Sequence, residues 1–420
     1  MFTETEQPLP PPTEDHRDKS VAPRVTSIST GVDGRLTSDR LREFERAAKC
    51  DDRVSGATHQ FYRYPARFSP IFARSAIELF SSEDDRVLDP YMGGGTTIVE
   101  AAIAGRKAVG IDLNELAVFV TKAKTTSLTT YQRMALMQWA ETVLGTLSFW
   151  DTSDTLESVL CERRTRNLNL PIARPIKKYI ALALTRLNEL PGEEARTIAR
   201  CALLNVGQWA LNGRSKSTPL AEFRQRVKNT VYEMVKAEED FSGTPTIKHQ
   251  PVILTGNSAD LPSLVESASI DLVVTSPPYP GIHILYHRWQ VDGRRESPAP
   301  YWISGCNDGK GTSYYNFADR KGADDNYFNE SLRTLRGIRT VMKETGYFVQ
   351  MIAFSDPSTQ LPRYLDNMRA AGFEEVRANE ELNTGKHRRI WRDVPRRSWH
   401  ATLKGETSSS REVVLIHRCA

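Results

Sequence analysis

Apolar and polar positions follow two different patterns along the chain, and each pattern predicts a different kind of structure. Short, largely apolar runs typical of buried strands occur at 86–89, 107–112, 251–256, 271–276, 346–354, 373–378 and 412–418. Helical spacing between them occurs at 71–80, 96–105 and 358–371, and Ser69 and Asn114 stand where they could cap helices. This alternation predicts an α/β fold with a mainly parallel sheet, helices on both faces and ligands at the carboxyl ends of the strands.

The pattern changes between about 129 and 236, where stretches compatible with helices follow one another and no strand signal interrupts them. We therefore predict a helical insertion at 126–250, as a region for DNA recognition or partner binding, within a sheet domain formed by 46–125 and 251–420. Residues 1–45 contain a proline tract and scattered charges without apolar periodicity, which predicts a flexible tail.

Composition places the chain among globular proteins without a membrane span. Of its 420 residues, 39% are hydrophobic and 26% charged, and no apolar run approaches the ~18 residues that a membrane helix needs. The first twenty residues lack the apolar segment of a signal peptide, so we expect a cytoplasmic protein. The five cysteines form no CxxC pair and no zinc-like spacing, which predicts reduced thiols and no metal site.

The net charge of +4 is concentrated in the predicted insertion. Residues 126–250 carry 17 Lys and Arg against 13 Asp and Glu, and the window 163–178 is basic without any acid. Such side chains could neutralise the phosphates of a nucleic acid, although a solvated helical face has the same composition. The candidates for DNA contact in this window are Arg163, Arg164, Arg166, Lys177 and Lys178.

The first motif with chemical content is Asp-Pro-Tyr-Met-Gly-Gly-Gly-Thr-Thr at 89–97, between a short strand and a helix. Gly93 and Gly95 permit a tight turn and close approach of a ligand to the backbone. The helix that starts at Thr96 and Thr97 favours an anionic group such as a carboxylate. Asp112, at the end of the next strand, can accept both hydroxyls of a ribose. The motif predicts a cofactor that contains a nucleoside.

The spacing of the glycines narrows the choice of cofactor. A dinucleotide fingerprint would need a third glycine where Ile98 stands, and a P-loop would need a Gly-Lys-Ser/Thr ending that is absent. A simple structural turn remains the alternative. S-adenosylmethionine fits better, because its carboxylate could meet the loop amides while Asp89 faces its ammonium group.

The second motif, Thr-Ser-Pro-Pro-Tyr at 275–279, follows the apolar run Asp-Leu-Val-Val. The consecutive prolines remove two backbone donors and leave carbonyl oxygens free to accept hydrogen bonds. If the Ser276 hydroxyl and the Pro277 carbonyl accept the two hydrogens of a nucleobase amine, its lone pair can point at a methyl donor. Tyr279 can stack on a base that has left its duplex. The alternative is a proline-rich loop that closes a strand.

Together these motifs resemble the amino-group DNA methyltransferases that use S-adenosylmethionine. DPYMGGGTT, GIDLN and TSPPY carry the resemblance, as does His-Gln-Phe-Tyr-Arg-Tyr-Pro-Ala-Arg-Phe at 59–68, and the similarity spans roughly 59–125 and 251–420. Ser before the prolines is similar to the cytosine-N4 branch, whereas the adenine-N6 branch favours Asp or Asn. The resemblance implies a Rossmann-like class I methyltransferase sheet. Cytosine-C5 methylation is disfavoured, because it needs a cysteine nucleophile, usually after proline, and no cysteine here follows a proline.

The resemblance also implies roles for individual residues, with Phe68 packed at the methionine end of the cofactor and Asp260 beside its adenine. The predicted cofactor-binding residues are Phe68, Asp89, Gly93, Gly95, Thr96, Thr97, Asp112 and Asp260. The predicted catalytic residues are Ser276, Pro277, Pro278 and Tyr279. We expect N4 methylation of a flipped cytosine in double-stranded DNA, within restriction-modification or a related defence system with a separate endonuclease or defence partner. Adenine-N6 methylation, RNA amino-methylation and an inactive DNA-binding module are the alternatives.

Two further segments combine basic and aromatic residues. The loop at 281–322 includes Arg288 among several tyrosines and tryptophans, which suits either DNA contact near the flipped base or a lid packed over the pocket. The segment at 386–399 contains Arg388 and Arg389, which could contact DNA or protect the edge of the sheet from aggregation.

Overall fold

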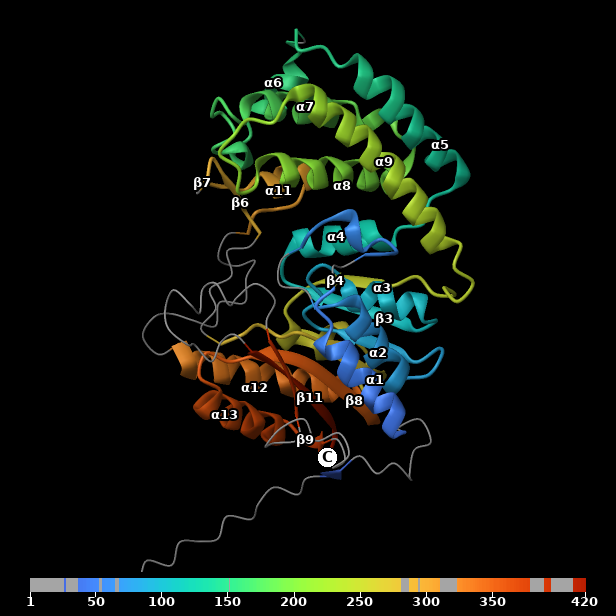
Figure 1. Cartoon of the computed structure of the whole chain (residues 1–420), viewed down its shortest axis with the longest axis vertical. Coiled ribbons are helices and arrows are strands. Elements are labelled where there is room, and N and C mark those ends of the chain that lie inside the picture. Colours follow the sequence, from blue (N-terminus) through green and yellow to red (C-terminus); the bar gives the residue numbers. More distant parts are fainter. Residues whose placement is uncertain are drawn as a thin grey trace, which may run out of the picture.

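A computed structural model shows how these segments are arranged in space (Figure 1). The structure describes residues 26–27, 37–52, 55–64, 68–150, 152–280, 287–293, 295–309, 323–377, 389–393 and 411–420. Much of the predicted tail, 1–45, lies outside these ranges. Its last part is not a tail but the start of helix α1 (Ser38–Lys49). The reason is that Leu41, Phe44 and Ala48 are buried on one side of this helix, against α2 (Pro70–Phe80).

A nine-stranded, mostly parallel sheet forms the centre of one part of the molecule. Its strands are β1 (Thr26–Ser27), β2 (Arg86–Asp89), β3 (Lys107–Asp112), β4 (Val252–Thr255), β5 (Ile270–Thr275), β8 (Met342–Ala353), β9 (Phe373–Arg377), β10 (Ile390–Asp393) and β11 (Arg411–Cys419). Along the sheet the order is β1-β9-β11-β8-β5-β2-β3-β4, and β10 pairs with β11. Strand β11 runs antiparallel to both of its neighbours β8 and β9, while the other neighbours along this order are parallel.

Helices cover both faces of this sheet, as the sequence pattern predicts. On one face α1, α2 and α3 (Thr96–Ile103) pack on apolar side chains such as Val87, Leu272 and Val349. On the other face α10 (Leu261–Leu264), α12 (Ala323–Val341) and α13 (Pro357–Ala370) pack on residues such as Leu88 and Val273. Successive residues of β2 thus point to opposite apolar layers, as in a sheet buried on both sides. The fold is a Rossmann-like α/β sheet.

Most of the predicted elements are present. All seven predicted strand segments contain strands, and the predicted caps are made: the Ser69 side chain accepts from Ile71 N, and the Asn114 side chain from Leu116 N at the start of α4 (Glu115–Thr125). Helix α12 was not among the predicted elements.

The helical stretch after Thr129 forms a second layer, which Figure 1 shows at the end of the molecule away from α12 and α13. Its helices are α5 (Thr130–Gln138), α6 (Asp154–Leu160), α7 (Arg174–Thr185), α8 (Gly192–Leu211) and α9 (Leu220–Ser242). The shared core also contains residues from beyond the Thr-Ser-Pro-Pro-Tyr motif, namely from β6 (Trp289–Val291) and α11 (Ala299–Ser304). β7 (Arg295–Ser297) pairs with β6. The helical layer is therefore built from two separate parts of the chain.

The order of the strands determines where a ligand can bind. From β2 the chain continues outward to β3 and β4 on one side, and it later returns to β5 and β8 on the other. The sequence direction reverses between β2 and β5, and in open parallel sheets the crevice at the carboxyl ends of strands at such a point is the usual binding site. Both predicted motifs lie at the carboxyl ends of these two strands, β2 and β5.

Candidate active site at the carboxyl ends of the strands

The glycine loop after β2 has the backbone geometry that its sequence predicts. Gly93 and Gly95 have φ values of 47° and 74°, in the left-handed region that favours glycine. A Cβ atom on Gly94 would lie 2.7 Å from the Cβ atom of Tyr64, so the loop passes closer to this ring than a side chain would allow. The buried Lys124 ammonium donates to the Gly94 carbonyl at 2.6 Å. Lys124, which was not among the predicted site residues, thus stabilises the loop.

Two buried carboxylates stand at the ends of neighbouring strands. Asp89 Oδ1 accepts from the Thr275 hydroxyl at 2.6 Å and from Tyr91 N at 3.1 Å. Asp112 accepts from Gly93 N at 2.9 Å and from Asn114 N at 2.8 Å. Burial raises the pKa of each carboxyl group to about 6, and the charge of Asp112 contributes to the shift of Asp89. Neither carboxylate forms an ion pair with another residue that the structure describes.

The other predicted cofactor residues differ in how close they lie to this loop. Phe68 is buried and meets the Phe72 ring edge-on, in the same apolar cluster as Met92 of the loop. Thr96 and Thr97 are buried at the start of α3, and the Thr97 hydroxyl donates to Val274 O of β5 at 3.1 Å. Asp260 ends the short turn η6 (Ser258–Asp260), with a side chain that is 59% exposed and 3.3 Å from Arg333.

The predicted catalytic residues begin with Ser276, directly after β5 and one strand from the glycine loop. The Ser276 hydroxyl lies 3.1 Å from the Tyr279 hydroxyl, which donates at 2.7 Å to Glu412 at the start of β11. Burial raises the pKa of Tyr279 well above its usual value, and the nearby charge of Glu412 raises it further. Tyr279 therefore stays protonated and acts as a hydrogen-bond donor. Glu412 was not predicted, because it lies 133 positions along the chain and only strand pairing brings it here.

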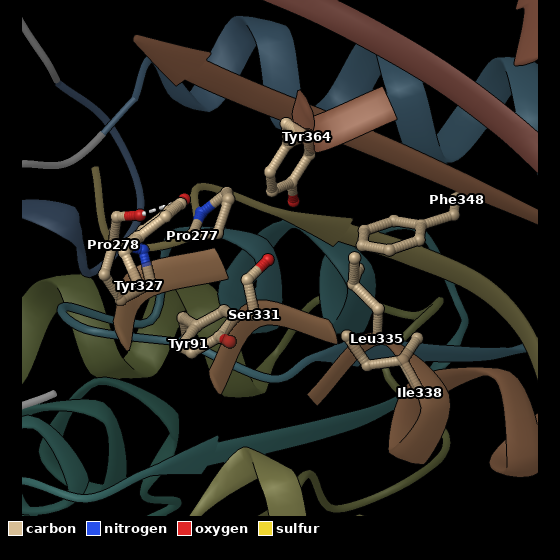
Figure 2. A pocket seen from close by; sticks show the side chains of 9 residues that line it. All are labelled: Tyr91, Pro277, Pro278, Tyr327, Ser331, Leu335, Ile338, Phe348 and Tyr364. Atoms are coloured by element: carbon tan, nitrogen blue, oxygen red, sulfur yellow. Dashed lines mark hydrogen bonds between the residues drawn. The ribbon is translucent and has the colours of Figure 1, made fainter. Parts of the chain in front are cut away.

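A small pocket lies behind the two prolines (Figure 2). It is lined by Tyr91, Pro277, Pro278, Tyr327, Ser331, Leu335, Ile338, Phe348 and Tyr364. The Tyr327 hydroxyl, from α12, donates to the Pro278 carbonyl at 3.0 Å. No hydrogen bond between described residues uses the Pro277 carbonyl. Helix α12 thus fixes the proline turn from one side, and the neighbouring carbonyl keeps its accepting capacity.

Comparison with known proteins gives matches that agree with this geometry. The family model N6_N4_Mtase, described as DNA methylase, matches residues 13–122. The Type II methyltransferase M.MvaI of Kocuria varians is 24% identical over 249 residues, which are 53% of each chain. M.BsoBI of Geobacillus stearothermophilus, also a Type II methyltransferase, is 39% identical over 56 residues, 13% of this chain and 11% of that protein.

The chain resembles the amino-group DNA methyltransferases. The family match includes the glycine loop and Asp112, and it ends before Ser276. It does not separate the N4 branch from the N6 branch. The chain spans about half the length of the first curated relative and less of the second.

Two more matches are a relative named for tRNA and a solved structure. A tRNA (guanine(10)-N2)-dimethyltransferase of Pyrococcus abyssi is 36% identical over 76 residues, 18% of this chain and 22% of that protein. The crystal structure of TrmN from Thermus thermophilus has 11% identity and a TM-score of 0.31, over 85% of this chain and 50% of that one. The fold assignment stands on the strand order given above.

The basic residues predicted to contact DNA fall into two groups. Arg163 and Arg166 are exposed beside the turn η4 (Arg163–Thr165) of the helical layer. The others donate within the protein: Arg164 to Tyr301 O, Lys177 to Asn169, Lys178 to Phe149 O, Arg288 to Asp308 and Arg389 to Glu375. Arg388 lies outside the described residues. Sequence composition could not distinguish these groups, since it does not report which charges are used internally.

The aromatic loop after the motif is partly a packing segment. Trp289, Tyr301 and Trp302 are buried in the core of the helical layer, whereas 281–286 and 310–322 lie outside the described residues. In the described part of the chain, no helix is long and apolar enough to cross a membrane, and no group of three His, Cys, Asp or Glu side chains is arranged to hold a metal ion.

Proposed function

We propose that this protein transfers a methyl group from S-adenosylmethionine to the N4 amino group of a flipped cytosine in double-stranded DNA. The observation that carries the proposal is the hydrogen bond between Asp89 and Thr275. It joins the end of β2, where the glycine loop begins, to the residue that precedes Ser276. The hydrogen bond joins two residues 186 positions apart and supports a common site for the glycine loop and the proline motif.

The charges of the crevice fit this cofactor. Two buried carboxylates without a described ion-pair partner favour a cationic ligand, and S-adenosylmethionine carries an ammonium and a sulfonium group. Asp89 would hold the ammonium group, Asp112 the ribose, and the loop amides with the start of α3 the carboxylate. When bound, the cofactor supplies an electrophilic methyl group. Phe68, Thr96, Thr97 and Asp260 complete the proposed cofactor-binding set.

The proline motif would position the amine that receives the methyl group. Ser276 Oγ and the Pro277 carbonyl accept its two hydrogens, so that the nitrogen lone pair is directed at the methyl donor. Pro278 keeps the turn rigid through its bond from Tyr327, and the Tyr279 ring lies against the flipped base. The rate enhancement would come from the orientation of the amine towards the methyl donor and from polar groups that are already in place. No covalent enzyme intermediate is needed.

Serine at position 276 supports cytosine as the target, since the adenine branch favours Asp or Asn there. The test is to incubate the protein with mixed-sequence DNA and labelled S-adenosylmethionine, digest the DNA and identify the labelled nucleoside by mass spectrometry. N4-methylcytosine is expected. N6-methyladenine would correct the base, label in RNA alone would favour RNA amino-methylation, as in the relative named for tRNA, and cofactor binding without transfer to either would favour an inactive binding module.

Binding of the cofactor is expected to tighten as the pH rises from 5 to 7. Asp89 and Asp112 both have pKa values of about 6, so each becomes ionised over this range, and the ionised form attracts the cationic ligand. Calorimetric titration at several pH values measures the effect. The Asp89→Asn variant should lose part of the pH dependence, and a parent affinity independent of pH would contradict the assignment.

The same pKa shifts act in the opposite direction on the stability of the free protein. The native state holds these protons more tightly than the unfolded chain, in which an aspartate has a pKa near 3.8. The resulting stabilisation is complete below pH 3.8 and is lost as the pH rises through about 6. Unfolding measured without cofactor therefore separates the two effects.

We propose that the helical layer contacts the DNA through Arg163 and Arg166. Charge reversal of either residue to Glu should weaken DNA binding by about tenfold and reduce the dependence of affinity on salt by roughly one to two phosphate contacts. Lys107→Glu, at the exposed amino end of β3, is the matched control. Equal losses in all three variants would indicate a general effect of charge. Lys177, Lys178, Arg164, Arg288, Arg388 and Arg389 remain further candidates.

A role in restriction-modification, beside a separate endonuclease, is part of the proposal. Two relatives named Type II methyltransferases support it. If it is correct, DNA treated with this protein and cofactor should resist cleavage by an endonuclease of the same recognition sequence.

A further inference from the structure

A line of four polar side chains connects the catalytic motif to the far strands of the sheet. Ser276 Oγ lies 3.1 Å from the Tyr279 hydroxyl, and that hydroxyl donates to Glu412 Oε1 at 2.7 Å. Arg392 Nε of β10 donates to Glu412 Oε2 at 2.7 Å, and Arg392 Nη1 also reaches the carbonyl of Ala48 in α1 at 3.4 Å. The side chains of Arg392 and Glu412 are only 10% and 9% exposed. The line is thus a largely buried connection.

The Arg392–Glu412 pair at one end of this line determines which group donates in each of its hydrogen bonds. Glu412 is paired with an arginine, so it is an ionised carboxylate, which can only accept. The single hydroxyl hydrogen of Tyr279 is therefore used on Glu412. In its contact with Ser276, the Tyr279 oxygen can only accept, and the hydroxyl hydrogen of Ser276 must point at it. Ser276 then turns its lone pairs away from Tyr279.

We propose that Glu412 and Arg392 are positioning residues that make Ser276 a hydrogen-bond acceptor for the amine of the target base. The inference rests on the proposed function, because it assumes that a lone pair of Ser276 Oγ, on the side away from Tyr279, accepts a hydrogen of the target amine. A serine hydroxyl can equally donate, and a donor pointed at the amine would oppose the geometry that transfer requires. The ion pair removes this ambiguity before substrate arrives, so no reorientation is needed during the reaction.

The variant that tests the direction is Glu412→Gln. A glutamine of the same size can donate as well as accept, so Tyr279 can turn its hydrogen towards Ser276, and the serine loses its fixed orientation. We expect the single-turnover rate of methyl transfer, with saturating DNA and cofactor, to fall about tenfold. The dissociation constants for both ligands should stay within about twofold of the parent, because neither ligand needs the direction of this hydrogen bond in order to bind.

A double-mutant cycle separates positioning from a structural role. Tyr279→Phe removes the hydroxyl through which Glu412 would act, so Glu412→Gln should have no further effect on the rate in that background. If the double variant instead lost rate by the product of the two single effects, the proposal would be overturned. The control for loss of a buried Arg–Glu pair is Glu375→Gln on the adjacent strand β9, where Glu375 is paired with Arg389 at 2.6 Å. This control should keep the parent rate, and thermal unfolding of all variants reports the fraction that is folded.

The outcomes also separate this inference from the proposed function. An active parent whose rate is unchanged by Glu412→Gln would refute the positioning role alone. An active parent with equal losses in Glu412→Gln and Glu375→Gln would show a structural effect and would likewise refute it. A folded parent that binds the cofactor and transfers no methyl group to DNA would refute the proposed function and, with it, the inference.

Discussion

Replacement of Ser276 with alanine is expected to lower the rate of methyl transfer about a hundredfold while cofactor affinity stays within about twofold of the parent. The variant removes the hydroxyl that accepts an amine hydrogen, and the loss of one such polar group from a prepared site typically costs two to three orders of magnitude in rate. Asp89, Asp112 and the glycine loop are untouched, so the cofactor should still bind. Single-turnover transfer and calorimetric titration measure the two quantities.

The matched control for this prediction is Ser269→Ala. Ser269 immediately precedes β5, at the opposite end of the strand from Ser276, and its hydroxyl donates to Glu266 O at 2.7 Å. Its loss removes a serine hydroxyl from the same strand without touching the motif. Parent-like transfer by Ser276→Ala would exclude the hydroxyl from the reaction, whatever base is methylated.

Replacement of Gly95 with alanine is expected to weaken cofactor binding by more than tenfold and to destabilise the fold by roughly 3 kcal/mol. Gly95 has a φ of 74°, which strains any residue with a Cβ atom. The added methyl group would also lie 2.6 Å from Thr121 Oγ1 and 2.7 Å from Thr121 Cγ2 of α4. Either the loop or the helix must move. Cofactor titration and thermal unfolding report the two effects.

A second glycine separates the backbone strain from the collision. Gly213 has a φ of 73°, and a Cβ atom built on it meets no atom within 4 Å. Gly213→Ala therefore carries the strain alone and should cost less stability, without loss of cofactor affinity. The double variant Gly95→Ala/Thr121→Ala removes the two closest atoms and should recover part of the stability. A Gly95→Ala protein that binds cofactor like the parent would show that the loop does not form the cofactor site.

Local sequence was sufficient to place most of the sheet and its two motifs. The strand before Asp89 and the strand before Ser276 are short apolar runs, and Ser69 and Asn114 are polar residues directly before helices. These signals lie within a few residues of the feature they specify. For the same reason the positive φ values of Gly93 and Gly95 could be expected from the glycines alone.

The supporting side chains of the site could not be found in this way. Glu412 reaches Tyr279 because β11 pairs with β8, and Lys124 reaches Gly94 because α4 folds back over the loop. Each contact depends on tertiary packing that leaves no mark in the neighbouring sequence. Charge composition was similarly uninformative for Lys177, which is buried and bonded to Asn169 although the sequence shows only another basic residue.

The helical layer cannot be treated as a removable module, because the chain enters it twice. Trp289, Tyr301 and Trp302, which come after the proline motif, are buried in the same core as Phe223 of α9 and Leu203 of α8. Deletion of 126–250 would leave these three aromatic side chains, all from the segment that follows the proline turn, without the core that buries them. An excised sheet domain should therefore aggregate, and transfer of the helical layer to another protein would need both segments to be transplanted together.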